Sequence, residues 1–412
     1  TLVLMNILYS LFLNFVQLIL PIIGLFNPKV KRFIINRKKI FHEVDYKFQS
    51  SKNNIWFHAA SLGEYELAVP LILEIKKKKN CKIILTFFSE SGFKLKNRIK
   101  EVDQYLYLPI DTKSNAIKFI EKINPSISIF IKSEIWPNFI TQLKKKKVPT
   151  YLINGRFTDN DWYFSKFNYF FEKHLKSFEK IFVQDYNSKK VLEKNGINNV
   201  INSGSTKVDR SIIQLSLENT ISKIEKIIKN KIVFVCGSTW AEDEAFIFKF
   251  LNETKKDDLI CLLAPHDISR SNIERIEKNI SVLFDKYSSD TILSEIKILI
   301  IDTIGDLKKL YSYADFSYVG GGMGNKGLHN ILEACIFMNP VIIGKNYTEF
   351  IEAVDLVNLN GVNSISDYVE FKETIESLIE SQDLRKEKKQ IIEKYINTNK
   401  GATNKILKNL KI

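Results

Sequence analysis

The stretch with the clearest chemical potential is Ile55–Glu66, which reads Ile-Trp-Phe-His-Ala-Ala-Ser-Leu-Gly-Glu-Tyr-Glu. A short apolar strand runs into small residues and then into a predicted helix, which places Glu64 in the first turn of that helix. Open α/β sheets carry their chemistry at the carboxyl ends of their strands, where this carboxylate would lie. However, Ser61 and Glu64 also have the spacing of a capping box, and spacing alone favours the cap. In either role, a carboxylate that accepts backbone hydrogen bonds is expected to have a lowered pKa.

A second candidate is the run Gly320–Gly327, with five glycines in eight residues after a predicted buried strand. Glycine lets the backbone approach a ligand closely, and the helix that follows would offer its amino terminus to an anion. The run lacks the Gly-Lys-Ser/Thr of a Walker loop and is not in the usual place of a dinucleotide fingerprint. It therefore indicates a nucleotide-linked donor. Asn330 and Glu333 have cap spacing, and Glu333 is equally suited to bind ribose hydroxyls.

Weaker signals accompany these two. Gly237-Ser238-Thr239 follows a predicted strand, and Glu242 stands at capping-box spacing from Thr239, so an anion site and a plain cap both explain it. Asp159-Asn160-Asp161 matches the acidic pair with which many glycosyltransferases hold a metal, but any acid-rich turn has this pattern, and we expect no metal there. His58 is expected in the core. His329, at the end of a loop, could contact a ligand.

The composition describes a globular chain of two domains, with 412 residues, 45% hydrophobic and 26% charged. A net charge of +14 suits a nucleic acid, an anionic membrane or a phosphorylated substrate. Basicity alone selects none of them, because Lys76–Lys79 and Lys144–Lys147 close amphipathic helices, where cations are favourable. The cysteines lack metal-ligand or disulfide spacing and are expected to be reduced and buried, as in a cytosolic domain. They are Cys81, Cys236, Cys261 and Cys335.

The N-terminal segment, residues 1–28, has no charged side chain, and Ile7–Phe26 gives 20 mostly apolar positions. That length can span a bilayer, and the absence of a small-residue cleavage site favours an uncleaved anchor. The basic flank from Lys29 to Lys39 would stay on the cytoplasmic side, together with everything that follows it. A monotopic helix that only dips into the membrane is the alternative. Met5, where the anchor pattern begins, is a candidate natural start.

Short β-branched runs alternate with amphipathic stretches through most of the chain, which indicates parallel sheets covered on both faces. The strand signal lapses around Ser211–Asn230 and then restarts. We therefore predict a membrane anchor (1–28), a Rossmann-like domain (29–210), a linker (211–230), a second Rossmann-like domain (231–390) and a C-terminal helix (391–412) that packs back on the first domain. The predicted strands are Ile55–Ala60, Lys82–Thr86, Gln104–Leu108, Ser126–Lys132, Thr150–Asn154, Lys180–Gln184, Asn199–Asn202, Ile232–Cys236, Leu259–Ala264, Ile296–Asp302, Asp315–Val319 and Pro340–Ile343.

Several blocks together resemble the 3-deoxy-D-manno-octulosonic acid (Kdo) transferases that glycosylate the lipid A precursor in Gram-negative bacteria. The resemblance runs from the anchor to about residue 350, and the blocks occur in the family's order. They are Trp56–Glu64, Lys132–Asn138 with its Glu-Ile-Trp-Pro-Asn, Ser203–Asp209, Asp302–Leu307 and Gly327–Glu333.

The resemblance implies an α/β fold of the GT-B type, two doubly wound domains with an interdomain cleft, and an inverting transfer of Kdo from CMP-Kdo to lipid IVA. Carried over by position, Glu64 would be the base, and Glu134 and Lys207 would stabilise the transition state. CMP-Kdo is a co-substrate, and no metal or other cofactor is implied. The residues that would hold CMP are Pro265, His266, Ile304, Gly305, Asp306, Asn330, Ile331, Leu332 and Glu333.

The same resemblance implies the bacterial inner membrane as location, with the catalytic domains on its cytoplasmic face. The expected partners are CMP-Kdo, the lipid A precursor and the anionic membrane surface, with no nucleic acid. His266 stands where many relatives carry Arg, so its phosphate contact is expected to be weaker or pH-sensitive. Two alternatives remain: another two-domain enzyme, such as a UDP-sugar transferase or epimerase, and a membrane-anchored scaffold with a lipid-binding basic surface.

Overall fold

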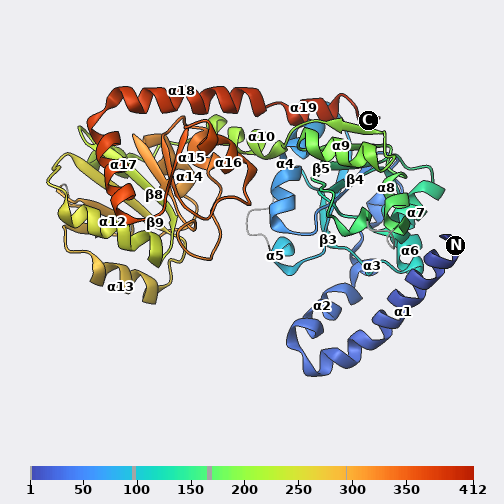
Figure 1. The fold of residues 1–412 in the computed structure, drawn as a ribbon. Helices are drawn as coiled ribbons and strands as arrows, with labels where there is room; N and C mark the ends of the chain where they lie inside the picture. Colours follow the sequence, from blue (N-terminus) through green and yellow to red (C-terminus); the bar gives the residue numbers. More distant parts are fainter. Residues whose placement is uncertain (1, 95–98, 165–168, 294) are drawn as a thin grey trace. The chain divides into compact units, whose positions relative to one another are not determined.

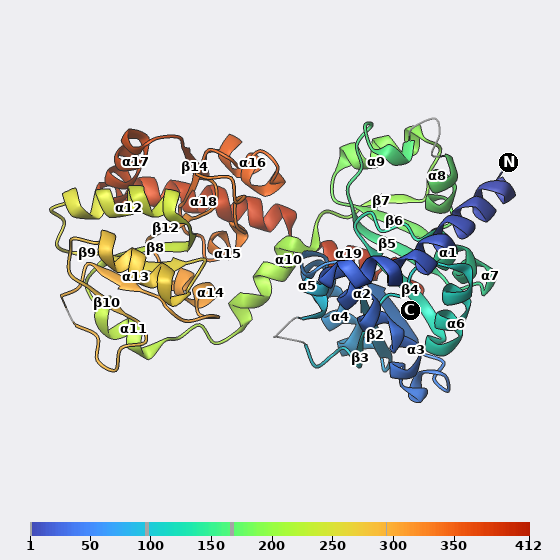
Figure 2. The ribbon, with the colours of Figure 1, turned by 90° about the horizontal axis from the view of Figure 1, so that it is seen from below.

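The computed structural model describes residues 2–94, 99–164, 169–293 and 295–412, and the chain divides into two compact units. Unit 1 comprises Thr1–Arg210 and Lys400–Ile412, and unit 2 comprises Ser211–Asn399. Each unit is built around one parallel seven-stranded sheet with helices on both faces (Figures 1 and 2). The predicted α/β class with two doubly wound domains is therefore confirmed.

The sheet of unit 1 has the strand order β3-β2-β1-β4-β5-β6-β7. Successive strands move outward from β1 to one edge, and the chain then returns to β4 and continues to the other edge. The order therefore reverses between β1 and β4, which is where such sheets place their ligands. The strands are β1 (Asn54–His58), β2 (Lys82–Phe87), β3 (Gln104–Tyr107), β4 (Pro125–Ile131), β5 (Thr150–Gly155), β6 (Lys180–Val183) and β7 (Val200–Asn202).

The strands of unit 1 are covered by helices with one buried face; α7, for example, begins with Pro at its first position and buries Phe139, Ile140 and Leu143. The helices are α1 (Leu2–Phe26), α2 (Pro28–Lys38), α3 (Ile40–Glu43), η1 (Tyr46–Phe48), α4 (Leu62–Lys78), α5 (Glu90–Phe93), α6 (Lys113–Ile123), α7 (Pro137–Lys145), η2 (Trp162–Phe164), α8 (Tyr169–Leu175), α9 (Tyr186–Lys194), α10 (Thr206–Ile212, which runs into unit 2) and α19 (Ala402–Leu407).

Unit 2 has a related arrangement with the order β10-β11-β9-β8-β12-β13-β14, in which β10 lies outside β11 and the reversal falls between β8 and β12. Its strands are β8 (Ile232–Thr239), β9 (Leu259–Pro265), β10 (Phe284–Lys286), β11 (Ile298–Ile300), β12 (Phe316–Val319), β13 (Val341–Gly344) and β14 (Val362–Ile365). Its helices are η3 (Ile213–Ser216), α11 (Ser222–Ile227), α12 (Ala241–Glu253), α13 (Arg270–Asn279), α14 (Leu307–Leu310), η4 (Tyr311–Tyr313), α15 (Leu332–Cys335), α16 (Ile351–Asn358), α17 (Tyr368–Glu380) and α18 (Gln382–Asn399).

The C-terminal segment returns to unit 1. The carboxylate of Asp209 accepts hydrogen bonds from the backbone N–H groups of Gly401 (2.6 Å) and Thr403 (2.7 Å), and α19 packs against α4. The helix pattern expected for residues 391–412 is divided between α18, which belongs to unit 2, and α19, which belongs to unit 1. The chain thus ends against the helix that carries Glu64.

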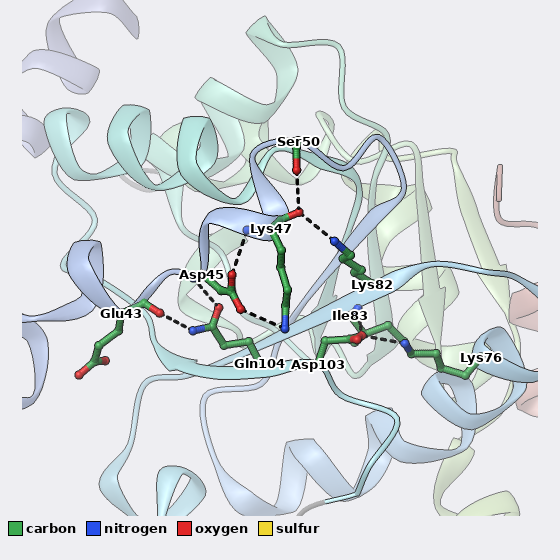
Figure 3. Close-up of polar contacts among 9 residues, drawn as sticks. All are labelled: Glu43, Asp45, Lys47, Ser50, Lys76, Lys82, Ile83, Asp103 and Gln104. Carbon is green, nitrogen blue, oxygen red and sulfur yellow. Dashed lines mark hydrogen bonds and ion pairs between the residues drawn. The ribbon is translucent and has the colours of Figure 1, made fainter.

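Polar contacts join the amino-terminal ends of β2 and β3 to the segment that precedes β1 (Figure 3). Asp103 Oδ2 accepts from Lys76 Nζ (2.7 Å) and from the backbone N–H of Ile83 (2.7 Å). Gln104 exchanges hydrogen bonds with backbone atoms of Glu43 and Asp45 at 2.5 and 3.1 Å. This end of the sheet is held by local pairs of opposite charge.

Among the described residues, one helix is long and apolar enough to cross a membrane, spanning Leu4–Phe26, and almost none of it is buried. Helix α2 follows directly. Its N-cap residue is Asn27, whose Oδ1 accepts a hydrogen bond from the backbone N–H of Lys29 at 2.9 Å. The N-terminal part of α1 lies against α8, whereas its remainder projects away from the sheet towards α2 (Figure 1). The length and apolar composition of this helix are compatible with the predicted anchor.

Candidate active site

Glu64 lies in the first turn of α4, directly after the turn that follows β1. Its Oε2 accepts a hydrogen bond of 2.5 Å from the backbone N–H of Ala60. Ser61 occupies the N-cap position, but among the described contacts its side chain makes no capping hydrogen bond. The predicted reciprocal box of Ser61 and Glu64 is therefore wrong. The carboxylate instead bridges the turn, which fixes its direction at the carboxyl end of β1.

Glu134 follows β4, the neighbour of β1 at the point where the strand order reverses. Its Oε2 accepts a hydrogen bond of 2.8 Å from Trp136 Nε1 and lies 3.5 Å from His58 Nε2. His58 is fully buried at the end of β1, as expected, and its other ring nitrogen lies 2.9 Å from Thr86 Oγ1. The sheet thus brings residues 58 and 134 into contact, a relation that spacing along the chain does not reveal.

The pKa of Glu64 is raised above its ordinary value, first by burial and then by the negative charge of Glu134. The Ala60 hydrogen bond and the electrostatic effects of His58 and Lys132 act in the opposite direction without cancelling the rise. The expectation of a lowered pKa is therefore wrong. That expectation counted the local hydrogen bond and missed the tertiary effects. A raised pKa makes this carboxylate a stronger base once it is ionised.

Lys207 is the second residue of α10, and this helix is fixed to α4. Thr206 Oγ1 donates to the carbonyl oxygen of Leu67 at 2.6 Å, and Arg210 Nε lies 2.5 Å from Glu66 Oε2. Leu67 is one turn along α4 from Glu64. Lys207 is thereby carried by a helix that is bound to the helix of the candidate base.

The residues expected to hold CMP lie in unit 2, after three strands of one sheet. Pro265 ends β9, Ile304–Asp306 follow β11, and Asn330–Glu333 lie in the segment after β12. Because these strands are parallel, the three groups lie at the same carboxyl edge. Lys308 Nζ pairs with Glu333 Oε1 at 3.1 Å, which joins the last two groups. The side chains of Ile331 and Leu332 are buried, so their possible ligand contacts come from the backbone.

Three aromatic rings stack at this edge. The ring of His266 is 4.5 Å from that of Trp240 and 4.6 Å from that of His329. Lys326 Nζ lies 5.2 Å from the centre of the Trp240 ring. Burial, with a smaller effect of His266, lowers the pKa of His329 to about 4, so this imidazole is neutral at neutral pH. The stack offers a flat surface and a cation, which suit a nucleotide.

The glycine run packs tightly against its own unit. A side chain on Gly320 would collide with backbone atoms of Ser238 and Thr239, and one on Gly322 would press on Gly344. Asp243 fastens the loop, since its Oδ2 accepts from the backbone N–H groups of Trp240 and Gly321, both at 2.9 Å. The cap of α12 is therefore Asp243 on Trp240, and the expected pairing of Glu242 with Thr239 is wrong by one residue.

The two acids of Asp159-Asn160-Asp161 form hydrogen bonds and an ion pair with neighbouring residues. Asp161 accepts from the backbone N–H (3.1 Å) and the hydroxyl (2.8 Å) of Thr158, and Asp159 pairs with Lys194 at 2.7 Å. Within the described part of the chain, no group of three or more His, Cys, Asp or Glu side chains is arranged to hold a metal ion. The four cysteines are buried free thiols.

The two doubly wound units define the GT-B fold class, with an acidic pair at the reversal of the first sheet and an aromatic stack at that of the second. A UDP-GlcNAc 2-epimerase from Neisseria meningitidis, solved bound to UDP-GlcNAc, shares this fold with a TM-score of 0.59 and 17% identity, over 86% of this chain and 98% of that one. Residues 34–210 match the family model described as 3-deoxy-D-manno-octulosonic-acid transferase (kdotransferase). Over this segment the chain is similar to the Kdo transferases.

Curated proteins show the same similarity. A 3-deoxy-D-manno-octulosonic acid transferase of Rickettsia felis is 31% identical over 73% of this chain. The match covers 65% of that relative, slightly less than two thirds of its length. One of Haemophilus influenzae is 27% identical over 98% of this chain and 97% of its own length.

Four residues at the carboxyl edges of the two sheets were not predicted as site residues from the sequence. His58 was assigned only to the core, and Trp240, Asp243 and Lys326 were not singled out. The available signal for Trp240 was its place directly after β8, the strand at the reversal of the second sheet. His58 had the same signal in the first sheet, because it is the last residue of β1.

Proposed function

We propose that the protein transfers Kdo from CMP-Kdo to the lipid A precursor lipid IVA, with inversion, in the synthesis of the lipopolysaccharide core. The observation that carries the proposal is the pair Glu64 and Glu134 at the reversal point of the first sheet, in a chain similar to the Kdo transferases. The full-length match to the H. influenzae protein, which is named as such a transferase, supports the same activity.

Glu64 acts as the base that takes the proton from the attacking hydroxyl of the acceptor sugar. Its raised pKa favours this role, because a general base works best when its pKa approaches the operating pH. As the bond to the phosphate of CMP breaks, negative charge develops on the departing group. Lys207 and oriented backbone amides stabilise that charge, and Glu134 stabilises positive charge on the sugar. No metal ion is required in this scheme.

Unit 1 binds the acceptor and unit 2 binds the nucleotide sugar in this proposal. CMP is held by Pro265–His266, Ile304–Asp306 and Asn330–Glu333, with the ring of Trp240 beside them. Glu333 binds ribose hydroxyls, and its pairing with Lys308 orients it. His266 replaces the common Arg, and its stacked position supports contact with the nucleotide.

The protein acts at the bacterial inner membrane, with both units on the cytoplasmic side. The apolar helix α1 supports this location, together with the basic residues that follow it. An acceptor with acyl chains is itself a membrane lipid, so a helix in the same bilayer brings the enzyme to its substrate. Anionic lipid at that surface is a further partner.

The direct test uses the purified full-length protein in detergent, CMP-Kdo and tetraacylated lipid A precursor, with a chelator and no added metal. Release of CMP together with a product heavier by Kdo in mass spectrometry is expected. Absence of transfer under these conditions contradicts the proposal. A UDP-sugar enzyme of the same fold would be stabilised against heat by UDP and not by CMP, and a scaffold by neither nucleotide.

A further inference from the structure

The helix α1 is attached to unit 1 by polar contacts. Tyr9 Oη donates to Asp111 Oδ2 at 2.9 Å, and Ser10 Oγ donates to Asn138 Oδ1 at 3.2 Å. The ring of Tyr9 also packs against that of Phe170, with 5.4 Å between the centroids. A simple hydrophobic anchor has no need of such contacts, so this face of α1 is built to fit the protein.

Asp111 is shared between α1 and α7. Its side chain is buried, with 1% of the residue exposed, and it closes the amino terminus of α7. Its Oδ1 accepts from the backbone N–H of Phe139 at 2.9 Å, and its Oδ2 accepts from that of Asn138 at 3.0 Å. Asn138 Nδ2 in turn donates to the carbonyl oxygen of Asp111 at 2.5 Å. Tyr9 supplies the one side-chain donor to this carboxylate among the described contacts.

The same end of α7 adjoins the loop that carries Glu134. Pro137 is the first residue of α7, and Trp136 stands at its N-cap position. The Trp136 indole donates to Glu134 Oε2 at 2.8 Å. A continuous series of contacts therefore runs from Tyr9 through Asp111 and the start of α7 to the Glu134 carboxylate.

The opposite face of α1 is apolar and open. Leu8, Phe12 and Leu18 are 55%, 62% and 74% exposed, and no acidic residue precedes Glu43 in the sequence. Lipid can cover this face while Tyr9 and Ser10 keep their partners on the protein. Binding to a membrane would thus hold α1 in place without breaking its contacts with unit 1.

We propose that Asp111 is a positioning residue, which couples the docked state of α1 to the placement of Glu134. The membrane helix is then a structural part of the active site and not only a tether. The functional half of this inference rests on the proposed role of Glu134. The structural half, the coupling between α1 and the loop, stands independently of it.

Hydrogen exchange of the full-length protein in nanodiscs tests the structural half. Tyr9→Phe removes one hydroxyl and keeps the ring contacts of α1. Exchange in a peptide that covers residues 133–139 is expected to rise at least threefold, because the amides of Asn138 and Phe139 lose a firmly placed acceptor. Tyr395→Phe is the matched control, since it removes a 3.3 Å phenol-to-carboxylate bond to Asp355 in unit 2. Unchanged exchange in Tyr9→Phe and also in Asp111→Asn overturns the coupling.

Steady-state kinetics test the functional half. Tyr9→Phe is expected to lower kcat by about threefold to tenfold and to leave KM for CMP-Kdo unchanged, because the nucleotide residues lie in unit 2. An unchanged kcat, or a loss confined to KM for CMP-Kdo, contradicts the positioning role. If the unaltered protein transfers no Kdo, the proposed function fails, while the exchange experiment still decides the coupling.

Discussion

The two ends of the first sheet differ in how their charged side chains are arranged. At the amino-terminal end, acids lie beside lysines, as in the pair Lys76 and Asp103 at 2.7 Å (Figure 3). Hydrogen bonds from Lys47 lower the pKa of Asp45 at this end. At the carboxyl end, two buried or half-buried acids of like charge, Glu64 and Glu134, interact across neighbouring strands, and the pKa of Glu64 is raised.

This difference separates contacts that hold the sheet together from groups that are arranged for chemistry. Exposed ion pairs contribute little to stability and cost little to form. Burying one carboxylate near another is unfavourable, and such arrangements concentrate at functional sites. One sheet therefore uses one end for local pairing and the other for reactivity.

Glu64→Gln tests whether the carboxyl end of the first sheet is the reactive end. The amide cannot accept the acceptor's proton, so transfer is expected to fall by about 10²- to 10⁴-fold. The fold should be retained, because the amide oxygen still accepts from Ala60 and the repulsion with Glu134 is removed. Product formation and circular dichroism measure the two effects. Glu74→Gln, at the far end of the same helix, is the control and should retain activity; near-normal transfer by Glu64→Gln would exclude it as the base.

Asp111 lies beyond β3 at the same carboxyl end, and burial raises its pKa from 3.8 to about 7. The folded protein therefore binds this proton more tightly than the unfolded chain does. The stabilisation by Asp111 is complete below about pH 4 and is lost as pH rises to about 7, by up to about 4 kcal/mol for about three pKa units. Denaturant unfolding of the native protein and of Asp111→Asn over this range measures it. A stability difference between them that does not fall with rising pH contradicts the prediction.

Glu134→Gln tests whether the acids act on one another. Its negative charge raises the pKa of Glu64, so its removal should shift the acidic limb of the pH–rate profile to lower pH. The rate itself should fall about tenfold, on the order of 1.4 kcal/mol in the activation barrier. Glu193→Gln, which lies on α9 and pairs with Lys189, provides the control. An acidic limb that stays in place would show that Glu134 does not affect the pKa of Glu64.

The sequence predicted the central strands better than the edges. All twelve expected strands exist, including the edge strands β3 and β7 of the first sheet, and most are apolar runs typical of strands buried on both faces. The two that were missed, β10 and β14, are the outermost strands of the second sheet and contain Asp285, Lys286, Asn363 and Ser364. Edge strands are only partly covered, so their composition resembles that of loops.

The local sequence pattern predicted Glu64 as a site residue, because its turn is encoded within a few residues. Glu134 and Lys207 were predicted only from the family resemblance. The partnership of His58 with Glu134 and of Tyr9 with Asp111 joins residues 76 and 102 positions apart. The strand order creates the first of these contacts and the packing of α1 on unit 1 creates the second. The direction of the Glu64 pKa shift was missed for the same reason, because burial and Glu134 outweigh the local hydrogen bond.

Trp240→Ala tests whether the carboxyl edge of the second sheet binds the nucleotide. Loss of its stack with His266 and of its contact with Lys326 is expected to weaken CMP binding about tenfold, as aromatic contacts contribute up to about 1.5 kcal/mol. Calorimetric titration with CMP measures this. Tyr368→Ala removes a surface aromatic ring that stacks on Phe371 in the same unit, and it should bind CMP normally. Equal affinities of the two variants would exclude the stack from the nucleotide site.

Lys76→Met addresses the amino-terminal end, where the smallest effect is expected. The variant removes a partly exposed pair with Asp103, while Asp103 keeps its hydrogen bond from the backbone of Ile83. The free energy of unfolding should fall by no more than about 1 kcal/mol, and kcat should not change. Urea unfolding and the transfer assay measure the two quantities. A large loss of activity would mean that charge at this end also reaches the site, and the division of the sheet into a paired end and a reactive end would then be wrong.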